Sequence, residues 1–344
     1  MNTQSSPSAP IRLGTRRSAL AQAQSGHVAA ALEKVTGRRV ELVAITSEGD
    51  TNRASLSEIG GQGIFATRLR EALLAGECDL LVHSLKDLPT AIPDGLVIAA
   101  TPEREDARDI VITRDGTPLH ELPAGSTVGT GSPRRIAQVH RHAPRAEIVD
   151  IRGNVDSRLA RVSSGDLDAV ILAAAGLSRL GDESPLQRTG SSLGWEAMGL
   201  AEWPTAPGQG SLAVETRADA PAELLEALAA LDDEDTRLAI TVERAILEGL
   251  DAGCQAPMAA HAVVEGDIIR VRTVVYATDG GRRIGLDVTE RLNGEYIHRN
   301  GSGNGADAAD GADPMHAARE LGLTLARRLL EKGAADLVSR EHSS

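Results

Sequence analysis

Short apolar runs alternate with amphipathic segments through the first half of the chain. Apolar runs typical of strands cover 11–14, 40–46, 79–84, 127–129, 147–151 and 169–173. Segments with apolar residues at helical spacing cover 18–35, 64–75, 133–142 and 155–163. Strands that alternate with helices in this way predict parallel sheets of the doubly wound type.

Charged and polar residues directly follow several of these predicted strands. They are Arg16, Lys86, Asp87, Arg134, Arg135 and Arg152. Ligands of doubly wound sheets bind outside the carboxyl ends of the strands. The pattern therefore predicts a binding region whose residues come from distant parts of the sequence.

Two segments look like connections between separate lobes. The segment 101–108 is rich in charge, and the segment 203–210 is rich in proline and glycine. A strand at 211–216 would then return to the first lobe. We expect two α/β lobes that face each other across a cleft. The first covers 1–103 with 207–231, and the second covers 104–206.

The pattern changes from about residue 232 onward. A predicted helix is followed by three β-type runs and a final amphipathic helix, and these elements cover 236–249, 260–264, 268–275, 283–291 and 314–330. This order predicts a small α+β domain over 232–344. Within it, the segment 299–313 is rich in Gly, Ala, Asn and Asp, which predicts a mobile loop.

The opening of the predicted helix at 133–142 is unusual. Ser132 is expected as its N-cap and Pro133 as its first residue, so Arg134 and Arg135 fall in the first turn. A cation near the positive end of a helix dipole typically costs about 0.3–1 kcal/mol, and an anion gains a similar amount. Free N–H groups together with guanidinium groups suit a carboxylate or phosphate. We therefore predict a polyanionic small molecule as the ligand.

The composition describes an acidic globular protein, so an acidic ligand would need a local cationic site. The net charge is −13, which opposes nucleic-acid binding, and aromatic residues are only 1% of the chain. The N-terminus lacks the apolar core of a secretion signal, and no uncharged apolar run could span a bilayer. We expect a cytoplasmic protein, monomeric because no heptad or exposed-strand pattern demands assembly.

The segment 83–89 places Ser84, Lys86 and Asp87 just past a buried strand. One interpretation is a surface ion pair between Lys86 and Asp87, which would contribute little. The other is that Asp87 stabilises a positive charge that develops on a substrate, since a lone carboxylate does not help to bind an anion. The sequence leaves both open.

Further candidates have equally simple structural explanations. Arg152 and Arg158 flank a turn in which Asn154 is expected as a helix N-cap, and Arg179 follows a later strand. All three could belong to solvated surfaces. Cys254 lies in a tight turn, where a packing residue is the usual role of a lone cysteine and a functional thiol the alternative.

Metal and nucleotide sites have no support in the motifs. The histidines are scattered, without His-Glu-x-x-His or paired cysteines. The glycine-rich segments 60–63 and 129–131 match neither a P-loop nor a dinucleotide fingerprint. A nucleotide-dependent transferase is therefore disfavoured.

Several short motifs together resemble the porphobilinogen deaminase family, also called hydroxymethylbilane synthase. They lie at 15–21, 60–65, 83–89, 103–109, 128–135, 152–155, 207–210 and 253–257. Each motif alone is weak, whereas their order and spacing are specific. The resemblance runs from residue 11 to about residue 259 and is weaker in the C-terminal domain.

The resemblance implies an enzyme with two periplasmic-binding-protein-like lobes and a third domain. It would condense four porphobilinogen molecules head to tail into a linear tetrapyrrole and release ammonia at each step. It would carry a dipyrromethane cofactor as the primer, joined by a thioether to Cys254. Asp87 would contact pyrrole N–H groups and stabilise the cation that remains when ammonia departs.

The resemblance also assigns the other site residues. The cofactor would be held by Ser84, Lys86, Thr130, Ser132, Arg134, Arg135 and Arg158. The substrate would be held by Arg16, Ser18, Arg152 and Arg179. The family often has serine where this chain has Gly131 and lysine where it has Gln62, which removes one hydroxyl donor and one charge.

A rival function fits the lobes and arginines equally well. A two-lobed, non-enzymatic anion-binding or ligand-sensing protein would show the same alternation of strands and helices. It would not explain the carboxylate of Asp87 beside an anion site, or the Cys254 turn.

Overall fold

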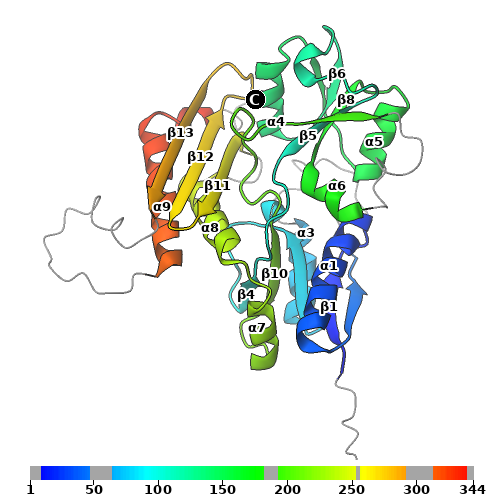
Figure 1. Ribbon diagram of the computed structural model, residues 1–344, viewed down its shortest axis with the longest axis vertical. Helices are drawn as coiled ribbons and strands as arrows, with labels where there is room; N and C mark the ends of the chain where they lie inside the picture. Colours follow the sequence, from blue (N-terminus) through cyan, green and yellow to red (C-terminus); the bar gives the residue numbers. More distant parts are fainter. Residues whose placement is uncertain (1–8, 47–63, 182–192, 253–255, 292–312, 339–344) are drawn as a thin grey trace, which may run out of the picture. The chain divides into compact units, whose positions relative to one another are not determined.

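The computed structural model describes residues 9–46, 64–181, 193–252, 256–291 and 313–338 of the chain (Figure 1). They form two compact units that interleave along the sequence. The first unit contains Met1–Arg104 and Ser211–Asp233, and the second contains Glu105–Gly210 and Glu234–Ser344.

The first unit is built on a five-stranded sheet with helices on both faces (Figure 1). Its strands are β1 (Ile11–Thr15), β2 (Val40–Ala44), β3 (Leu80–Ser84), β4 (Leu96–Ala100) and β10 (Leu212–Arg217), in the order β2-β1-β3-β10-β4. Its helices are α1 (Ala19–Thr36), α3 (Ile64–Leu74) and α7 (Ala222–Ala229), with a 3-10 turn, η1 (Leu85–Asp87). Leucine, valine and alanine side chains of α1 and α7 pack on one face of the sheet, and those of α3 on the other.

The second unit contains a second five-stranded sheet of the same kind. Its strands are β5 (Asp109–Thr113), β6 (Thr127–Gly129), β7 (Glu147–Val149), β8 (Ala169–Ala173) and β9 (Gly194–Ala197), in the order β7-β6-β8-β5-β9. Its helical elements are η2 (Leu119–Glu121), α4 (Pro133–His142), α5 (Val155–Ser163) and α6 (Ala174–Leu180). The α4 helix covers one face of the sheet, whereas α5 and α6 cover the other.

A three-stranded antiparallel sheet completes the second unit. The strands β11 (Met258–Glu265), β12 (Ile268–Tyr276) and β13 (Arg283–Arg291) pack against α8 (Glu234–Gly249), α9 (Pro314–Glu331) and the short α10 (Ala335–Val338) (Figure 1). The other face of this sheet contacts α4, where Ala137 packs on Val274 and Tyr276. The predicted α+β domain is confirmed.

The α/β fold class is confirmed, but the two large sheets are mixed rather than purely parallel. In the first, β10 runs antiparallel to both β3 and β4. In the second, β5 runs antiparallel to both β8 and β9. The two antiparallel strands, β5 and β10, each directly follow one of the two connecting segments. A strand that enters from another unit is not constrained by the right-handed crossover that makes consecutive strands parallel.

The predicted helices and strands agree with the structure to within about two residues at their ends. The strand predicted to return to the first lobe is β10, which pairs with β3 and β4. The predicted loop at 299–313 and the glycines at 60–63 lie outside the described residues. The predicted domain boundaries at 103, 206 and 231 stay predictions. No helix within the described ranges has both the length and the apolar character needed to cross a bilayer.

Two helical glycines give a matched test of the packing between α8 and α9. A Cβ atom at Gly322 would lie 2.5 Å from both the Ala245 Cβ and the Val242 carbonyl oxygen, whereas one at Gly26 of α1 would meet nothing within 4 Å. We expect Gly322→Ala to lower the free energy of unfolding by about 1–3 kcal/mol through overpacking. Gly26→Ala should raise it by about 0.5–1 kcal/mol. Urea unfolding measures both, and a stabilising Gly322→Ala would contradict the packing described.

Candidate active site

The end of β1 leads directly, through Arg16 and Arg17, into the start of α1. Arg16 is half-buried just past the strand, and Ser18 is the N-cap of α1, where its hydroxyl accepts the Ala21 N–H at 3.4 Å. Gly14 in β1 has no room for a side chain, because a Cβ atom would lie 2.7 Å from Leu81 and 2.8 Å from the Cys78 sulfur. The close approach of β1 to β3 therefore fixes where Arg16 leaves the sheet.

The end of β3 carries the candidate catalytic carboxylate. Ser84, whose hydroxyl accepts a 3.0 Å hydrogen bond from Gln24, is followed by the η1 turn, and the Leu85 N–H donates to the Ser211 carbonyl at 3.1 Å. Leu85 is buried, Lys86 is half-buried and Asp87 is exposed. Among the described residues, the Asp87 carboxylate forms no hydrogen bond or ion pair. The interpretation as a surface pair with Lys86 is therefore wrong.

A buried charge cluster supports β3 immediately before this turn. The Glu215 carboxylate is fully buried and binds Arg70 through Nε at 3.0 Å and Nη2 at 2.8 Å. His83 Nε2 lies 3.1 Å from the same carboxylate. Burial would raise the pKa of Glu215, but His83 and Arg70 hold it below its usual value. The cluster ties β3, β10 and α3 together beneath the Asp87 turn.

The start of α4 presents unpaired donors. Pro133 is the first helical residue and Ser132 the N-cap, as predicted, but the Ser132 hydroxyl makes no capping bond to the helix. Within the described part of the chain, this half-buried hydroxyl makes no hydrogen bond. Thr130 is buried, and its hydroxyl accepts the Ser132 N–H at 3.3 Å. The first-turn N–H groups and the Ser132 hydroxyl are the groups to which a ligand anion would bind.

Arg134 and Arg135, by contrast, point into the protein. They are only 3% and 6% exposed, and both pair with the fully buried carboxylate of Asp109, at 2.9 Å and 2.6 Å. Trp203 Nε1 donates to the same carboxylate at 2.9 Å, and Gln209 Nε2 donates at 2.8 Å. The burial of both arginines was not predicted from the sequence, which placed them among the groups at the helix opening that suit an anion. Positive charge in the first turn of α4 is tolerated because the buried Asp109 carboxylate pairs with both arginines.

The Asp109 cluster is not electrically neutral. Two guanidinium groups and one carboxylate leave one net positive charge beneath the start of α4. Burial would raise the pKa of Asp109, but Arg134 and Arg135 hold it far below its usual value, so the acid stays ionised. Arg134 Nε is also buried without a hydrogen-bond partner among the described residues. An anion at the helix opening would compensate the remaining charge.

The turn that opens α5 positions two more cations. The Asn154 side chain accepts the Ser157 N–H at 2.9 Å, which confirms the predicted N-cap. Arg152 is exposed, and its Nε lies 3.8 Å from Asp150. Arg158 is half-buried, and its Nε donates to the Gly153 carbonyl at 2.9 Å. Arg152 follows β7 in the chain, as the doubly wound pattern predicted, and Arg158 lies within α5.

Arg179 is buried beside the second connecting segment. The resemblance to the porphobilinogen deaminase family groups it with the substrate-binding arginines. It is only 9% exposed, and its Nη2 donates to the Gly210 carbonyl at 2.6 Å. Burial lowers the pKa of Arg179 from its usual value, with Glu105 opposing that shift. Its hydrogen bond is to the backbone of the second connecting segment.

Cys254 and Gln62 lie outside the described residues. Cys78, the other cysteine, is fully buried, and burial raises the pKa of its thiol to about 11. The described residues contain no group of three or more His, Cys, Asp or Glu residues that could hold a metal ion.

Almost the whole length of the chain matches known proteins. Residues 11–224 match the family model "Porphobilinogen deaminase, dipyromethane cofactor binding domain". Residues 237–331 match "Porphobilinogen deaminase, C-terminal domain". The chain belongs to the porphobilinogen deaminase family. This supports an enzyme rather than a non-enzymatic anion-binding or ligand-sensing protein.

Curated relatives cover almost the whole chain. The porphobilinogen deaminase of Leifsonia xyli is 48% identical over 95% of this chain and 94% of its own length. Porphobilinogen deaminase 1 of Streptomyces coelicolor is 48% identical over 95% and 97%, and the Thermobifida fusca protein is 45% identical over 96% of each. Among solved structures, the Bordetella pertussis BvgS periplasmic VFT2 domain is similar to 64% of this chain and 85% of its own, with a TM-score of 0.37 and 15% identity.

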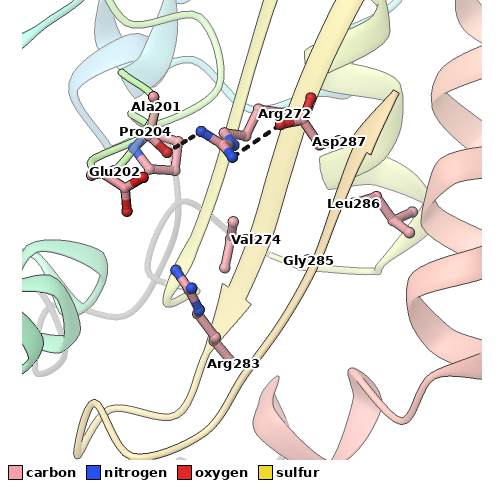
Figure 2. Close-up of a pocket in the computed structure, with 9 residues that line it drawn as sticks. All are labelled: Ala201, Glu202, Pro204, Arg272, Val274, Arg283, Gly285, Leu286 and Asp287. Atoms are coloured by element: carbon pink, nitrogen blue, oxygen red, sulfur yellow. Dashed lines mark hydrogen bonds and ion pairs between the residues drawn. The ribbon is translucent and has the colours of Figure 1, made fainter. Parts of the chain in front are cut away.

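The second unit also has an open groove, and none of its lining residues is among the predicted site residues. Its volume is about 300 Å³, and its lining residues are Ala201, Glu202, Pro204, Arg272, Val274, Arg283, Gly285, Leu286 and Asp287. Figure 2 shows Arg272 reaching from β12 to the Ala201 carbonyl and to Asp287. The two arginines are matched by two carboxylates. Because the lining charges cancel, the groove is not selective for an anion.

Several residues that build the site had no role predicted from the sequence. Asp109 and Gln209 lie within motifs that resemble the porphobilinogen deaminase family, and Trp203 lies in the second connecting segment. Their mutual contacts are not visible in the pattern. The sequence did contain one indication of this contact. Asp109 is the first residue of a strand of apolar residues, and a buried carboxylate at such a position needs a buried partner. Glu215 within β10 gives the same signal.

We expect Asp109→Asn to lower the free energy of unfolding at neutral pH by about 3–5 kcal/mol, because it leaves two buried cations without their acid. Asp106→Asn is the matched control. Asp106 pairs with Arg108 at 2.7 Å, but both side chains are partly exposed, so its loss should cost about 1 kcal/mol or less. Urea unfolding of both variants tests this, and equal losses would contradict the role given to Asp109.

Wild type and the Asp109→Asn variant also give a test that depends on pH. The folded-state pKa of Asp109 is lowered, so its stabilisation is complete above the unfolded pKa of about 3.9 and is lost as pH falls through the folded value. The difference in unfolding free energy between wild type and Asp109→Asn should therefore be constant near neutral pH and shrink below about pH 4. A difference that grows on acidification would show that the acid is not ionised in the folded protein.

Proposed function

We propose that this chain condenses four porphobilinogen molecules head to tail into the linear tetrapyrrole hydroxymethylbilane, releasing ammonia at each addition. The match over almost the entire length to porphobilinogen deaminases carries this proposal. The chemistry of the described residues agrees with it. A buried net positive charge lies beneath donors suited to carboxylates, and a separate acid stands unpaired at a strand end.

Asp87 is the proposed catalytic residue. Loss of ammonia from the aminomethyl carbon of porphobilinogen leaves a cation that is delocalised over the pyrrole ring and its nitrogen. An ionised carboxylate aimed at that ring lowers the energy of the developing charge and accepts a hydrogen bond from the pyrrole N–H. The exposed Asp87 side chain has no competing partner among the described residues, so it is available for this contact.

The residues around the start of α4 fit a dipyrromethane cofactor. Its acetate and propionate groups are anions, and the Asp109 cluster has one uncompensated positive charge and a buried, unpartnered Arg134 Nε. When bound, the cofactor supplies the pyrrole end to which new units are added. We propose that it is held by Ser84, Lys86, Thr130, Ser132, Arg134, Arg135 and Arg158. In this proposal Arg134 and Arg135 act mainly through their buried charge, and Ser132 through its free hydroxyl.

Cys254 is the proposed attachment point. The thiolate is the nucleophilic form of cysteine, so an attachment residue must ionise readily. Cys78 does not, because its buried thiol has a pKa raised to about 11. Cys254 is the other cysteine of the chain. A thioether at this position also resists the reductants that break disulfides in the cytoplasm.

Arg16, Ser18 and Arg152 are proposed to hold the carboxylates of the incoming substrate. Each porphobilinogen unit brings two carboxylates, so a growing chain needs several cationic partners. Arg152 is exposed at the start of the α5 turn, and Arg16 leaves the first sheet beside the α1 N-terminus. We propose the same role for Arg179, whose guanidinium would exchange its hydrogen bond to the Gly210 carbonyl for one to a substrate carboxylate.

We further propose that the enzyme works as a monomer in the cytoplasm, without nucleic acid. The net charge of −13 would repel a nucleic-acid backbone.

The variant Asp87→Ala should lower kcat at least about 100-fold, because the developing cation loses its counter-charge. The protein should still fold and retain its cofactor. Asp94→Ala is the matched control, an exposed aspartate in the same segment that should leave kcat within about twofold of wild type. Ammonia release and cofactor content measure the two effects. Wild-type ammonia release from Asp87→Ala would remove this residue from the mechanism.

The variant Cys254→Ala should carry no cofactor, whereas Cys78→Ala should carry it. Intact mass spectrometry of the purified proteins measures this directly, as the mass excess of one dipyrromethane over the polypeptide. Loss of the excess in Cys254→Ala alone is the expected result. An unmodified wild-type chain, or an excess that persists in Cys254→Ala, would contradict the attachment.

A further inference from the structure

A tyrosine of the C-terminal sheet reaches the helix that carries candidate cofactor residues. Tyr276 is the last residue of β12 and is only 1% exposed. Its ring packs on Ala137 of α4, and its hydroxyl accepts a hydrogen bond from Gln138 Nε2 at 3.3 Å. Burial raises the pKa of Tyr276, although the nearby charge of Arg134 opposes that shift. The hydroxyl is therefore neutral at neutral pH and can accept this bond.

Gln138 connects this tyrosine to Arg134. Its side chain is 1% exposed, and its Oε1 accepts a hydrogen bond at 2.7 Å from Arg134 Nη1, one turn earlier on the same face of α4. Its Nε2 donates to the Pro204 carbonyl at 2.8 Å as well as to Tyr276. A reversed amide would place its hydrogens against the guanidinium and its oxygen against the Pro204 carbonyl. The orientation of the Gln138 amide is therefore fixed.

Arg134 depends on fixed partners because its contacts are concentrated at one nitrogen. Its Nη1 bonds to Gln138, to the Pro204 carbonyl at 3.3 Å and to the Asp109 carboxylate at 2.9 Å. Its Nε has no hydrogen-bond partner in the described part of the chain. A guanidinium held at one nitrogen can turn about that point unless its acceptors are rigid. The Tyr276 hydroxyl holds one of these acceptors, Gln138, and so limits the rotation.

We infer that Tyr276 is a positioning residue for Arg134, acting through Gln138 to hold the guanidinium beneath the start of α4. Tyr276 belongs to the sheet of the C-terminal α+β domain, whose first strand follows the proposed attachment residue Cys254 in the chain. One sheet would thus support both the covalent attachment and the charge that meets the cofactor carboxylates. This inference rests on the proposed role of Arg134 in holding the cofactor.

A positioning role and a merely structural role for the Tyr276 hydroxyl predict different results. A hydroxyl that only stabilises the fold lowers the free energy of unfolding when it is lost, but leaves turnover unchanged. A hydroxyl that positions Arg134 also affects turnover, because the cofactor is displaced, and leaves KM nearly unchanged. Thr273 provides the matched control. It is another buried residue of β12, and its hydroxyl donates to the Ala259 carbonyl at 3.0 Å within the same sheet.

The experiment compares holoenzymes of wild type, Tyr276→Phe and Thr273→Val by urea unfolding and by ammonia release from porphobilinogen. We expect both variants to unfold at a lower urea concentration than wild type, because each loses a buried hydrogen bond. Tyr276→Phe alone should lower kcat, by about 3- to 10-fold with KM within about threefold. In a Gln138→Met background, Tyr276→Phe should have no further effect on kcat, because the connection to Arg134 is already broken.

A second readout does not depend on activity. The chain has two tyrosines, Tyr276 and Tyr296, so protein labelled with 13C at the tyrosine Cζ gives two NMR signals, which Tyr276→Phe assigns. The Tyr276 signal should lie at different positions in the holoenzyme and in Cys254→Ala, because the cofactor carboxylates change the charge balance around Arg134.

Equal kcat in Tyr276→Phe and Thr273→Val would overturn the inference, as would a Tyr276→Phe effect that persists undiminished in the Gln138→Met background. A Tyr276 signal at one position with and without cofactor would overturn it too. If Gln138→Met does not fold, the NMR signal and the comparison with Thr273→Val decide. Failure of the proposed function itself would look different, because wild type would then release no ammonia from porphobilinogen.

Discussion

Much of the second unit depends on one buried carboxylate. Asp109 stands at the start of β5 and accepts bonds from Arg134 and Arg135 of α4, from Trp203 and from Gln209. Asp109 thus joins β5 to the α4 helix and to the second connecting segment. Burying three charges costs several kcal/mol per ion unless they are paired, so this arrangement fixes the relative positions of its members strongly. A displacement of any one would leave a charge unpaired in the protein interior.

The same cluster explains how an acidic protein can bind an acidic ligand. The chain has a net charge of −13, but beneath the start of α4 the balance is positive by one. The positive charge is fixed before any ligand arrives, so no reorganisation is needed on binding. The environment of the proposed catalytic acid is the opposite. Asp87 is exposed and free of partners among the described residues, while the charges that support its strand, Glu215 with Arg70 and His83, are buried behind it.

The sequence predicted local features well because their causes are local. The helix at 133–142 and the N-cap Asn154 follow from periodicity and capping chemistry, and the structure has both. The antiparallel directions of β5 and β10 were not predicted, because they depend on which unit a strand enters. The pairing of Arg134 with Asp109 was missed for the same reason, since no periodic pattern connects residues that far apart. The burial of Arg179 was not predicted either, because it depends on where the second connecting segment runs.

We propose that anchored carboxylates bind at the start of α4, with Asp109 holding its arginines in place beneath them. The decisive measurement is a crystal structure of the cofactor-loaded protein. We expect an acetate or propionate group of the cofactor within hydrogen-bonding distance of the Ser132 hydroxyl or the first N–H groups of α4, and Asp109 still paired with Arg134 and Arg135. Cofactor carboxylates bound away from the start of α4, or an Asp109 carboxylate separated from both arginines, would contradict it.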